Sequence, residues 1–274
     1  MLSYIKLKKN PHNFLQLTGL KVSEFDNIVN LLHEPWSKIE SQKKCHGRTS
    51  HLPTLEDKVL CIVIYYKTYI SHTFLGYLFN LHNSNICRLF KVIEPLLAGK
   101  ITINKDRSLT SEKLLKILAD VTEQEIQRPI KQQKKSYSGK KKRHTIKTEL
   151  VIEESGQILS VSKSHKGRIH DFRIRKSEKL LPINSIKYAD LGYQGLQKLQ
   201  SNVVIPFKRL KKIPLTKDMK TFNRNLASFR MKVEHKIREI KIFKIMSYVY
   251  RNFQKKYNMR FNIIAGIVNL KHGF

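Results

Sequence analysis

The sequence predicts an α/β fold in which a mixed five-stranded sheet is flanked by helices and preceded by a small all-α region. One observation is that apolar residues recur at helical spacing up to about residue 105. Another is that short apolar segments then alternate with helical ones, as in a sheet that is covered on both faces. We therefore expect a helical domain at residues 1–105 and an α/β domain at residues 106–274.

The α/β domain is expected to contain three strands, a helix, a strand, a helix, a strand and a long helix, in that order. The expected strands are Leu114 to Ala119, Thr145 to Glu153, Gln157 to Ser162, Ile186 to Ala189 and Val203 to Phe207. The expected helices are Asp171 to Leu181, Leu196 to Gln200, Lys217 to about Met246, and a last one near Phe261 to Leu270.

In the helical domain, residues that favour helix caps precede the apolar runs. Ser23 to Asp26 predicts a capping box that opens a helix to about His33, followed by a polar stretch from about Glu40 to Ser50. Three further short helices are predicted because each of three apolar runs follows a capping residue, Thr54, Ser71 or Ser84.

The last two of these helices indicate a helix-turn-helix module within residues 52–95. They are separated by Asn80 to Asn83, a turn length typical of such modules, whose second helix enters the major groove of DNA. The residues that we expect to face DNA are Asn83, Asn85, Arg88 and Lys91. A small helical bundle without DNA contact is the alternative.

The charge of the chain indicates a polyanionic partner. There are 53 Lys and Arg against 21 Asp and Glu, a formal net charge of +32, and nucleic acid relieves such self-repulsion. An anionic membrane surface is the alternative, but the basic residues are spread along the chain and no apolar run approaches the roughly 18 residues of a membrane span. The N-terminus has no apolar core of a signal peptide, and Cys45, Cys61 and Cys87 have no zinc or disulfide spacing, which favours a reducing cytosol.

The densest run of one charge is Lys131 to Arg143. It holds seven basic residues and is predicted to form a loop that leads into the second strand. We expect phosphate contacts from Lys140, Lys141, Lys142 and Arg143. A solvated loop is the alternative.

Three acidic residues stand out in this basic chain. Asp120 is predicted to end the first strand and Asp190 the fourth, and Glu234 lies in the long C-terminal helix. Each aspartate could cap the turn that follows it, and Glu234 could pair with Arg230 or Arg238 one helical turn away.

The position of Glu234 on its helix favours a shared site. Arg230, Glu234 and Lys241 fall within roughly 40° on a helical wheel, beside an apolar stripe of Leu226, Phe229, Val233, Ile237 and Ile240. The charged row thus lies at the edge of the core, where it is expected to reach the strand ends that carry the aspartates. Three carboxylates together favour Mg²⁺ or Mn²⁺, and two such ions support phosphoryl transfer. Arg230 and Lys241 are expected to hold phosphate oxygens or the neighbouring strand.

These residues closely resemble a DDE-type bacterial insertion-sequence transposase, in which a helix-turn-helix region precedes a ribonuclease H-like catalytic domain. Arg230, Glu234 and Lys241 have the intervals of the third-acid region in that family, whereas Ala227 stands where the family has tyrosine. The segments ILADVTEQEIQRP and ADLGYQG resemble the blocks that carry the first two acids, and SYSGKKKRHTIK and KGRIHDFRIRKS also resemble family blocks.

The resemblance implies metal-dependent hydrolysis at the ends of the element, followed by attack of the freed 3′ hydroxyl on target DNA. The implied catalytic and metal-binding residues are Asp120, Asp190 and Glu234. The implied partners are double-stranded DNA, both terminal inverted repeats and target, and a second copy of the chain in the DNA complex. The implied location is the bacterial cytoplasm, at the nucleoid.

His170 and Asp171 are expected to support the site. We expect Asp171 to stabilise the start of a helix and His170 to lie behind the metal ligands and orient them. The alternatives to a transposase are a transposase-derived DNA-binding protein or repressor without catalysis, and another ribonuclease H-like nuclease. A pure DNA binder has no reason to keep three acids near bound DNA, which favours the enzyme.

Overall fold

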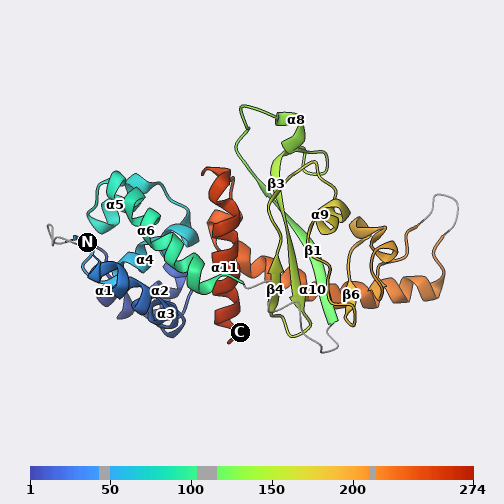
Figure 1. The fold of residues 1–274 in the computed structure, drawn as a ribbon, viewed down its shortest axis with the longest axis horizontal. Coiled ribbons are helices and arrows are strands. Elements are labelled where there is room, and N and C mark those ends of the chain that lie inside the picture. The colour runs from blue at the N-terminus through green and yellow to red at the C-terminus, as the bar shows by residue number, and fades with distance from the viewer. Residues whose placement is uncertain (43–49, 104–115, 210–213) are drawn as a thin grey trace. The chain divides into compact units, whose positions relative to one another are not determined.

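A computed structural model describes residues 1–42, 50–103, 116–209 and 214–274 (Figure 1). The chain divides into two compact units. The helical unit comprises residues 1–102, 241–248 and 259–274, and the sheet unit comprises residues 103–240 and 249–258. Three parts of the sequence prediction lie outside the described residues. They are the domain boundary at residue 105, the cysteine at position 45 and the start of the strand expected from Leu114.

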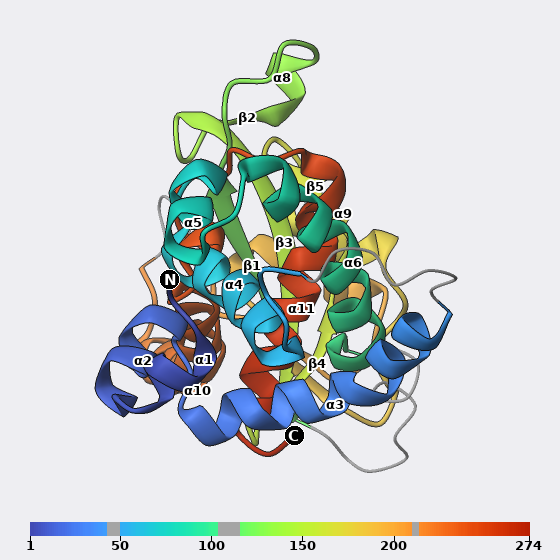
Figure 2. The ribbon, with the colours of Figure 1, turned by 90° about the vertical axis from the view of Figure 1, so that its left-hand side faces the viewer.

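The helical unit is built around one buried helix. Its elements are α1 (Tyr4–Lys8), α2 (Pro11–Thr18), α3 (Val22–Ser41), α4 (Leu55–Thr68), α5 (His72–Phe79), α6 (Asn83–Ile101), the 3₁₀ helix η3 (Lys244–Met246) and most of α11 (Tyr257–Lys271). Every residue of α4 from Leu55 to Tyr66 except Glu56 is buried. The first six helices thus pack as a bundle with α4 in contact with each of the others, as Figure 2 shows.

Two of the four predicted caps in this unit are confirmed. The Thr54 hydroxyl accepts from the Asp57 N–H at 3.2 Å, and the Ser71 hydroxyl accepts from the Phe74 N–H at 3.1 Å. The prediction for Ser84 is wrong by two residues, because the imidazole of His82 occupies the cap position and accepts from the Ser84 N–H.

The prediction for α3 is wrong at both ends. The helix starts at Val22, and the Glu24 carboxylate accepts from the Lys21 N–H at 2.8 Å, so the capping box begins before Ser23. It continues through Pro35 to Ser41. A proline removes one helical hydrogen bond, but the buried apolar face of α3 compensates for this loss.

The sheet unit contains a mixed sheet flanked by helices, as predicted. Its strands are β1 (Lys116–Glu125), β2 (Tyr137–Ser138), β3 (Arg143–Glu153), β4 (Ile158–Val161), β5 (His165–Lys166), β6 (Ile186–Tyr188) and β7 (Val203–Val204). In the described chain the order is β2-β3-β1-β6-β7, with β4 and β5 also on β3. β3 is antiparallel to β1, whereas β6 and β7 are parallel to their neighbours.

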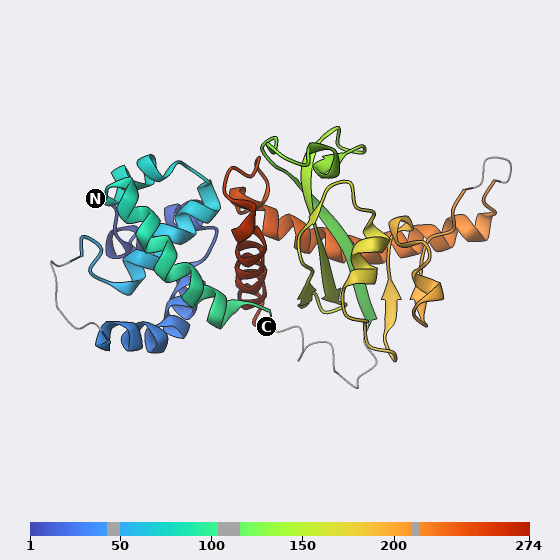
Figure 3. The same ribbon diagram turned by 45° about the horizontal axis from the view of Figure 1, so that its top comes forward.

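Helices cover both faces of this sheet. The helical segments are α8 (Gln133–Ser136), α9 (Asp171–Ser177), α10 (Lys217–Lys241) and the 3₁₀ helices η1 (Leu191–Tyr193), η2 (Leu196–Lys198) and η4 (Gln254–Lys256). On one face Ile117 and Ala119 pack with Tyr193 and Leu196, and Phe172 of α9 joins them. On the other face α10 crosses the strands (Figure 3). The ring centroids of Phe229 on α10 and Tyr188 on β6 lie 4.5 Å apart.

Several predicted bounds in the sheet unit are wrong. Asp120 does not end its strand, because β1 continues for five more residues to Glu125, paired with the start of β3. This extension is polar because it is partly exposed, so its sequence resembles a loop. The predicted loop at residues 131–143 contains α8 and β2, and α10 ends at Lys241.

Residues 241–248 and 259–274 belong to the helical unit. The sequence had instead predicted one continuous domain at residues 106–274. Arg260 of α11 forms a buried ion pair with Glu94 of α6, with Nε and Oε1 2.6 Å apart. Gly266 of α11 packs against the carbonyl of Ile101, where an added Cβ would lie 1.9 Å from the oxygen. Within the described residues, no helix is long and apolar enough to cross a membrane.

Candidate active site

Asp120 lies in the middle of β1, opposite Leu150 of β3. Its Oδ1 accepts a hydrogen bond from the Val121 N–H at 2.8 Å. Burial raises the pKa of Asp120 to about 6, the Arg230 guanidinium and the Val121 hydrogen bond oppose this, and the charges of Asp190 and Glu234 raise it further. Asp120 is therefore within electrostatic reach of the two other predicted acids.

Asp190 lies just beyond the neighbouring strand. In the parallel pair of β1 and β6, Leu118 aligns with Tyr188, so Asp120 and Asp190 each lie two residues past an aligned pair. Adjacent strands are about 4.8 Å apart, which brings these two aspartates to neighbouring positions. The Asp190 carboxylate accepts from the Leu191 N–H at 2.7 Å and begins the turn of η1.

Helix α10 supplies a cation and the third acid. Arg230 Nη1 lies 3.1 Å from Asp190 Oδ1, with 13% of the Arg230 side chain and 46% of the Asp190 side chain exposed. Glu234, one turn later, is exposed. The Nε of Arg230 is buried without a hydrogen-bond partner among the described residues. The apolar stripe is confirmed for Leu226, Val233 and Ile240, which are buried.

The three acids suit a hard divalent cation by their chemistry. All are carboxylates, and mutual repulsion contributes to the raised pKa of Asp120, so a cation among them would be favoured. In the described part of the chain, no group of three His, Cys, Asp or Glu side chains is arranged as a ready metal site. Arg230 supplies positive charge to both aspartates.

The two residues that were predicted to support the site, His170 and Asp171, lie at the start of α9. His170 occupies the cap position without a side-chain cap bond, and Asp171 is the first helical residue. The Asp171 carboxylate pairs with Lys147 of β3 at 2.9 Å. Lys241, the last residue of α10, lies about 10 Å along the helix axis from Glu234 by helical geometry.

The residues that were predicted to face DNA are all exposed on α6: Asn83, Asn85, Arg88 and Lys91. The turn is tight: Asn80 has a left-handed backbone with φ of 52°, and a Cβ on Gly76 would lie 2.2 Å from the Leu81 carbonyl. Asn85 and Arg88 also line a pocket of about 370 Å³ with Trp36, Lys58 and neighbouring apolar side chains.

The basic segment is accessible as well. The side chains of Lys140, Lys141, Lys142 and Arg143 are exposed where the chain enters β3. Arg143 also pairs with Glu125 of β1 at 2.7 Å, so part of its charge is already neutralised. The three lysines are thus the stronger candidates for phosphate contact.

Sequence reasoning missed one group of polar residues in the sheet unit. Glu149 of β3 and Arg175 of α9 form an ion pair with side chains 1% and 2% exposed. The available signal was Glu149, a charged residue beside the apolar run Leu150 to Ile152, at a position where strand alternation predicts an inward side chain.

Comparisons with known proteins agree with this fold and show the family of the chain. Residues 119–269, more than half of the chain, match the family described as DDE superfamily endonuclease. Residues 50–102 match the helix-turn-helix of DDE superfamily endonuclease. The chain therefore belongs to the DDE superfamily of endonucleases.

A named relative refines the comparison. The chain is 37% identical over 266 residues, 93% of each chain, to a probable transposase for insertion sequence element IS702 from Microchaete diplosiphon. The predicted resemblance to insertion-sequence transposases is thereby confirmed. No solved structure matches the chain significantly.

Proposed function

We propose that this chain is the transposase of an insertion sequence, which hydrolyses DNA at the ends of its element and joins the freed 3′ hydroxyl to target DNA. The observation that carries the proposal is Asp120, a partly buried carboxylate whose pKa is raised to about 6 and which feels the charges of Asp190 and Glu234, in a member of an endonuclease superfamily. Catalytic sites are where such strongly perturbed acids gather.

The proposed ligands of two Mg²⁺ or Mn²⁺ ions are Asp120, Asp190 and Glu234. When bound, such ions activate the attacking oxygen and stabilise the leaving one. The strand holds Asp120 in place, whereas the pairing of Arg230 with Asp190 orients that carboxylate. Arg230 and Lys241 are proposed to hold phosphate oxygens of the DNA strand, since both side chains are cationic. The guanidinium of Arg230 can in addition form bidentate hydrogen bonds with a phosphate.

Recognition of DNA is assigned to two surfaces. Asn83, Asn85, Arg88 and Lys91 on α6 are proposed to read the element end in the major groove. The lysines at 140–142 are proposed to neutralise phosphates, which makes binding fall steeply with salt. A homodimer is expected in the DNA complex because two ends must be held together, and His170 with Asp171 is expected to support the site.

The test uses labelled DNA that carries the terminal repeats of the element, with Mg²⁺ or Mn²⁺. Wild-type protein is expected to release a 3′ hydroxyl at the element end and join it to target DNA. Asp190→Asn is expected to bind the same DNA without cutting it. Equal cleavage by the wild type and Asp190→Asn would refute the assignment, and binding without cleavage by the wild type would favour a repressor.

A further inference from the structure

The turn that carries Asp190 is not held by the sheet as Asp120 is. Strand β6 ends at Tyr188, and the Ala189 N–H donates to the Val204 carbonyl at 3.1 Å. Asp190 follows outside the strand, at the start of η1. Something other than strand pairing must therefore fix this turn.

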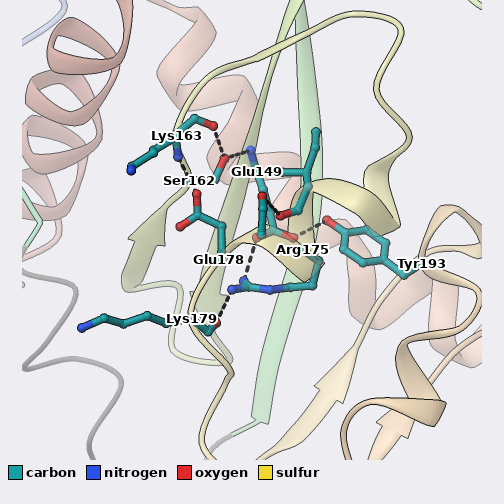
Figure 4. A network of polar contacts seen from close by, with 9 residues as sticks. Glu149, Ser162, Lys163, Arg175, Glu178, Lys179 and Tyr193 are labelled. Carbon is teal, nitrogen blue, oxygen red and sulfur yellow. Dashed lines mark hydrogen bonds and ion pairs between the residues drawn. The ribbon is translucent and has the colours of Figure 1, made fainter.

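Tyr193 connects the turn to the protein interior. Its N–H donates to the Asp190 carbonyl at 2.9 Å, which closes the turn. Its ring, 1% exposed, is packed in the apolar cluster on the sheet face that α9 covers. Its hydroxyl donates to Glu149 Oε1 at 2.9 Å, as Figure 4 shows.

Glu149 is a fixed anchor because several elements hold it. It lies on β3 opposite Val121, the residue after Asp120. Its Oε2 accepts from Arg175 Nη1 at 2.7 Å, and Arg175 also donates to the Lys179 carbonyl. The Glu149 N–H donates to the Ser162 hydroxyl at 2.8 Å, so β3, α9 and the end of β4 are tied together (Figure 4).

Gly192, which precedes Tyr193 in the turn, lies directly against α9. A Cβ on Gly192 would lie 2.9 Å from Asp171 Oδ2, so the glycine backbone rests directly against that carboxylate. Lys147 of β3 holds the other carboxylate oxygen at 2.9 Å. The φ angle of Gly192 is not in the left-handed region, so it is the lack of a side chain that the contact requires.

We propose that Tyr193 is a positioning residue for Asp190, anchored by the buried Glu149–Arg175 pair, with Gly192 against Asp171 as a second support. This inference rests on the proposed function, in which Asp190 is a metal ligand. A carboxylate on a short turn moves with that turn, and loss of groups that orient metal ligands typically weakens metal affinity about 10- to 100-fold.

The test compares two buried hydroxyls in the same unit. Tyr193→Phe removes the hydroxyl bound to Glu149, whereas Tyr257→Phe removes another, from a side chain 1% exposed that hydrogen-bonds Thr148 of β3. Binding of Mn²⁺ alone to the full chain is measured by calorimetry, and thermal unfolding is measured alongside.

The expected result separates positioning from general loss of packing. Both variants are expected to unfold at a somewhat lower temperature, but Tyr193→Phe is expected to bind Mn²⁺ about tenfold more weakly and Tyr257→Phe as wild type does. Equal affinity in the two variants overturns the proposal.

Two further variants complete the design. If wild type and Asp190→Asn bind Mn²⁺ equally, the proposed function itself fails; if only Asp190→Asn is weakened, the role of Tyr193 alone fails. Should Tyr193→Phe not fold, Gly192→Ala decides, because its methyl group displaces the turn without removing a hydroxyl. Weaker Mn²⁺ binding by Gly192→Ala supports the inference, and wild-type binding overturns it.

Discussion

Two carboxylates on paired strands of the same sheet, Glu149 fully buried and Asp120 partly buried, have opposite surroundings. Glu149 meets Arg175 and the Tyr193 hydroxyl and is 1% exposed. Asp120, on the other face, accepts one hydrogen bond among the described residues, from its own neighbour Val121. Burial raises the pKa of both, to about 7 for Glu149 and about 6 for Asp120.

The difference separates a structural acid from a proposed catalytic one. A buried charge costs free energy unless it is paired and hydrogen-bonded, and Glu149 meets that condition within the protein. Asp120 meets it incompletely, which leaves its oxygens available for a ligand. Glu149, which is fully paired, therefore stabilises the fold. Asp120, which is incompletely paired, is the residue that we propose to take part in catalysis.

The largest expected effect is on activity. Asp120→Asn is expected to lower DNA cleavage about 10⁴-fold or more, because its carboxylate would be required in the transition state. The measurement is single-turnover cleavage of end-labelled DNA. If the variant retained more than a tenth of wild-type cleavage, the proposed catalytic role of Asp120 would be contradicted, and Asp120 would be a structural residue like Glu149.

The next effect is on stability. Glu149→Gln is expected to lower the free energy of unfolding by about 3 to 5 kcal/mol, because it leaves the Arg175 guanidinium buried without a counter-charge. Urea unfolding measures this loss, and Asp120→Asn under the same conditions is expected to lose nothing. If the two variants are equally destabilised, the distinction between the two acids does not hold.

A smaller effect concerns pH without divalent ions. The folded pKa of Asp120, about 6, exceeds the value of about 4 in an unfolded chain. The folded state thus holds this proton more tightly, so the contribution of Asp120 to stability is present at low pH and is lost as pH rises from about 4 to 6. Asp120→Asn should remove this part of the decline, up to about 3 kcal/mol, in unfolding curves measured between pH 4 and 7.

Added Mg²⁺ sharpens the same measurement. Since the ion competes with the proton for Asp120, its stabilising effect is expected to grow from pH 5 to 7 and to reach about 2.7 kcal/mol at 100 times the dissociation constant. The control is the same measurement in buffer that contains a chelator and no divalent ions. A Mg²⁺ effect of the same size in Asp120→Asn would show binding elsewhere.

The smallest expected effect is that of Glu234 on stability. Its side chain is exposed on α10, so Glu234→Gln is expected to change the free energy of unfolding by no more than about 0.5 kcal/mol while cleavage is lost. Thermal unfolding and the cleavage assay together check this. A large loss of stability would mean that Glu234 belongs with Glu149 as a structural acid.

Sequence patterns predicted much of this arrangement where local signals are strong. The caps Thr54 and Ser71, the buried stripe of α10 and the proximity of Asp120 to Asp190 follow from side-chain periodicity and strand order. The extension of β1 past Asp120 could not be predicted, because its polar residues gain their strand geometry from pairing with β3.

The role of Tyr193 was hidden for a different reason. The contact between Tyr193 and Glu149 joins residues 44 apart in sequence, and neither position signals the other. Likewise, the packing of residues 259–274 with the helical unit depends on contacts such as Arg260 with Glu94, which no local pattern indicates.

That packing has a consequence for biosynthesis. The carboxylate of Glu94, fully buried, leaves the ribosome long before its partner Arg260 does. The helices that we propose to read DNA therefore cannot reach their final stability until the chain has been translated past Arg260. A chain that ends before Arg260 lacks this ion pair, so we expect the helical unit of an incomplete product to be less stable than that of the full chain.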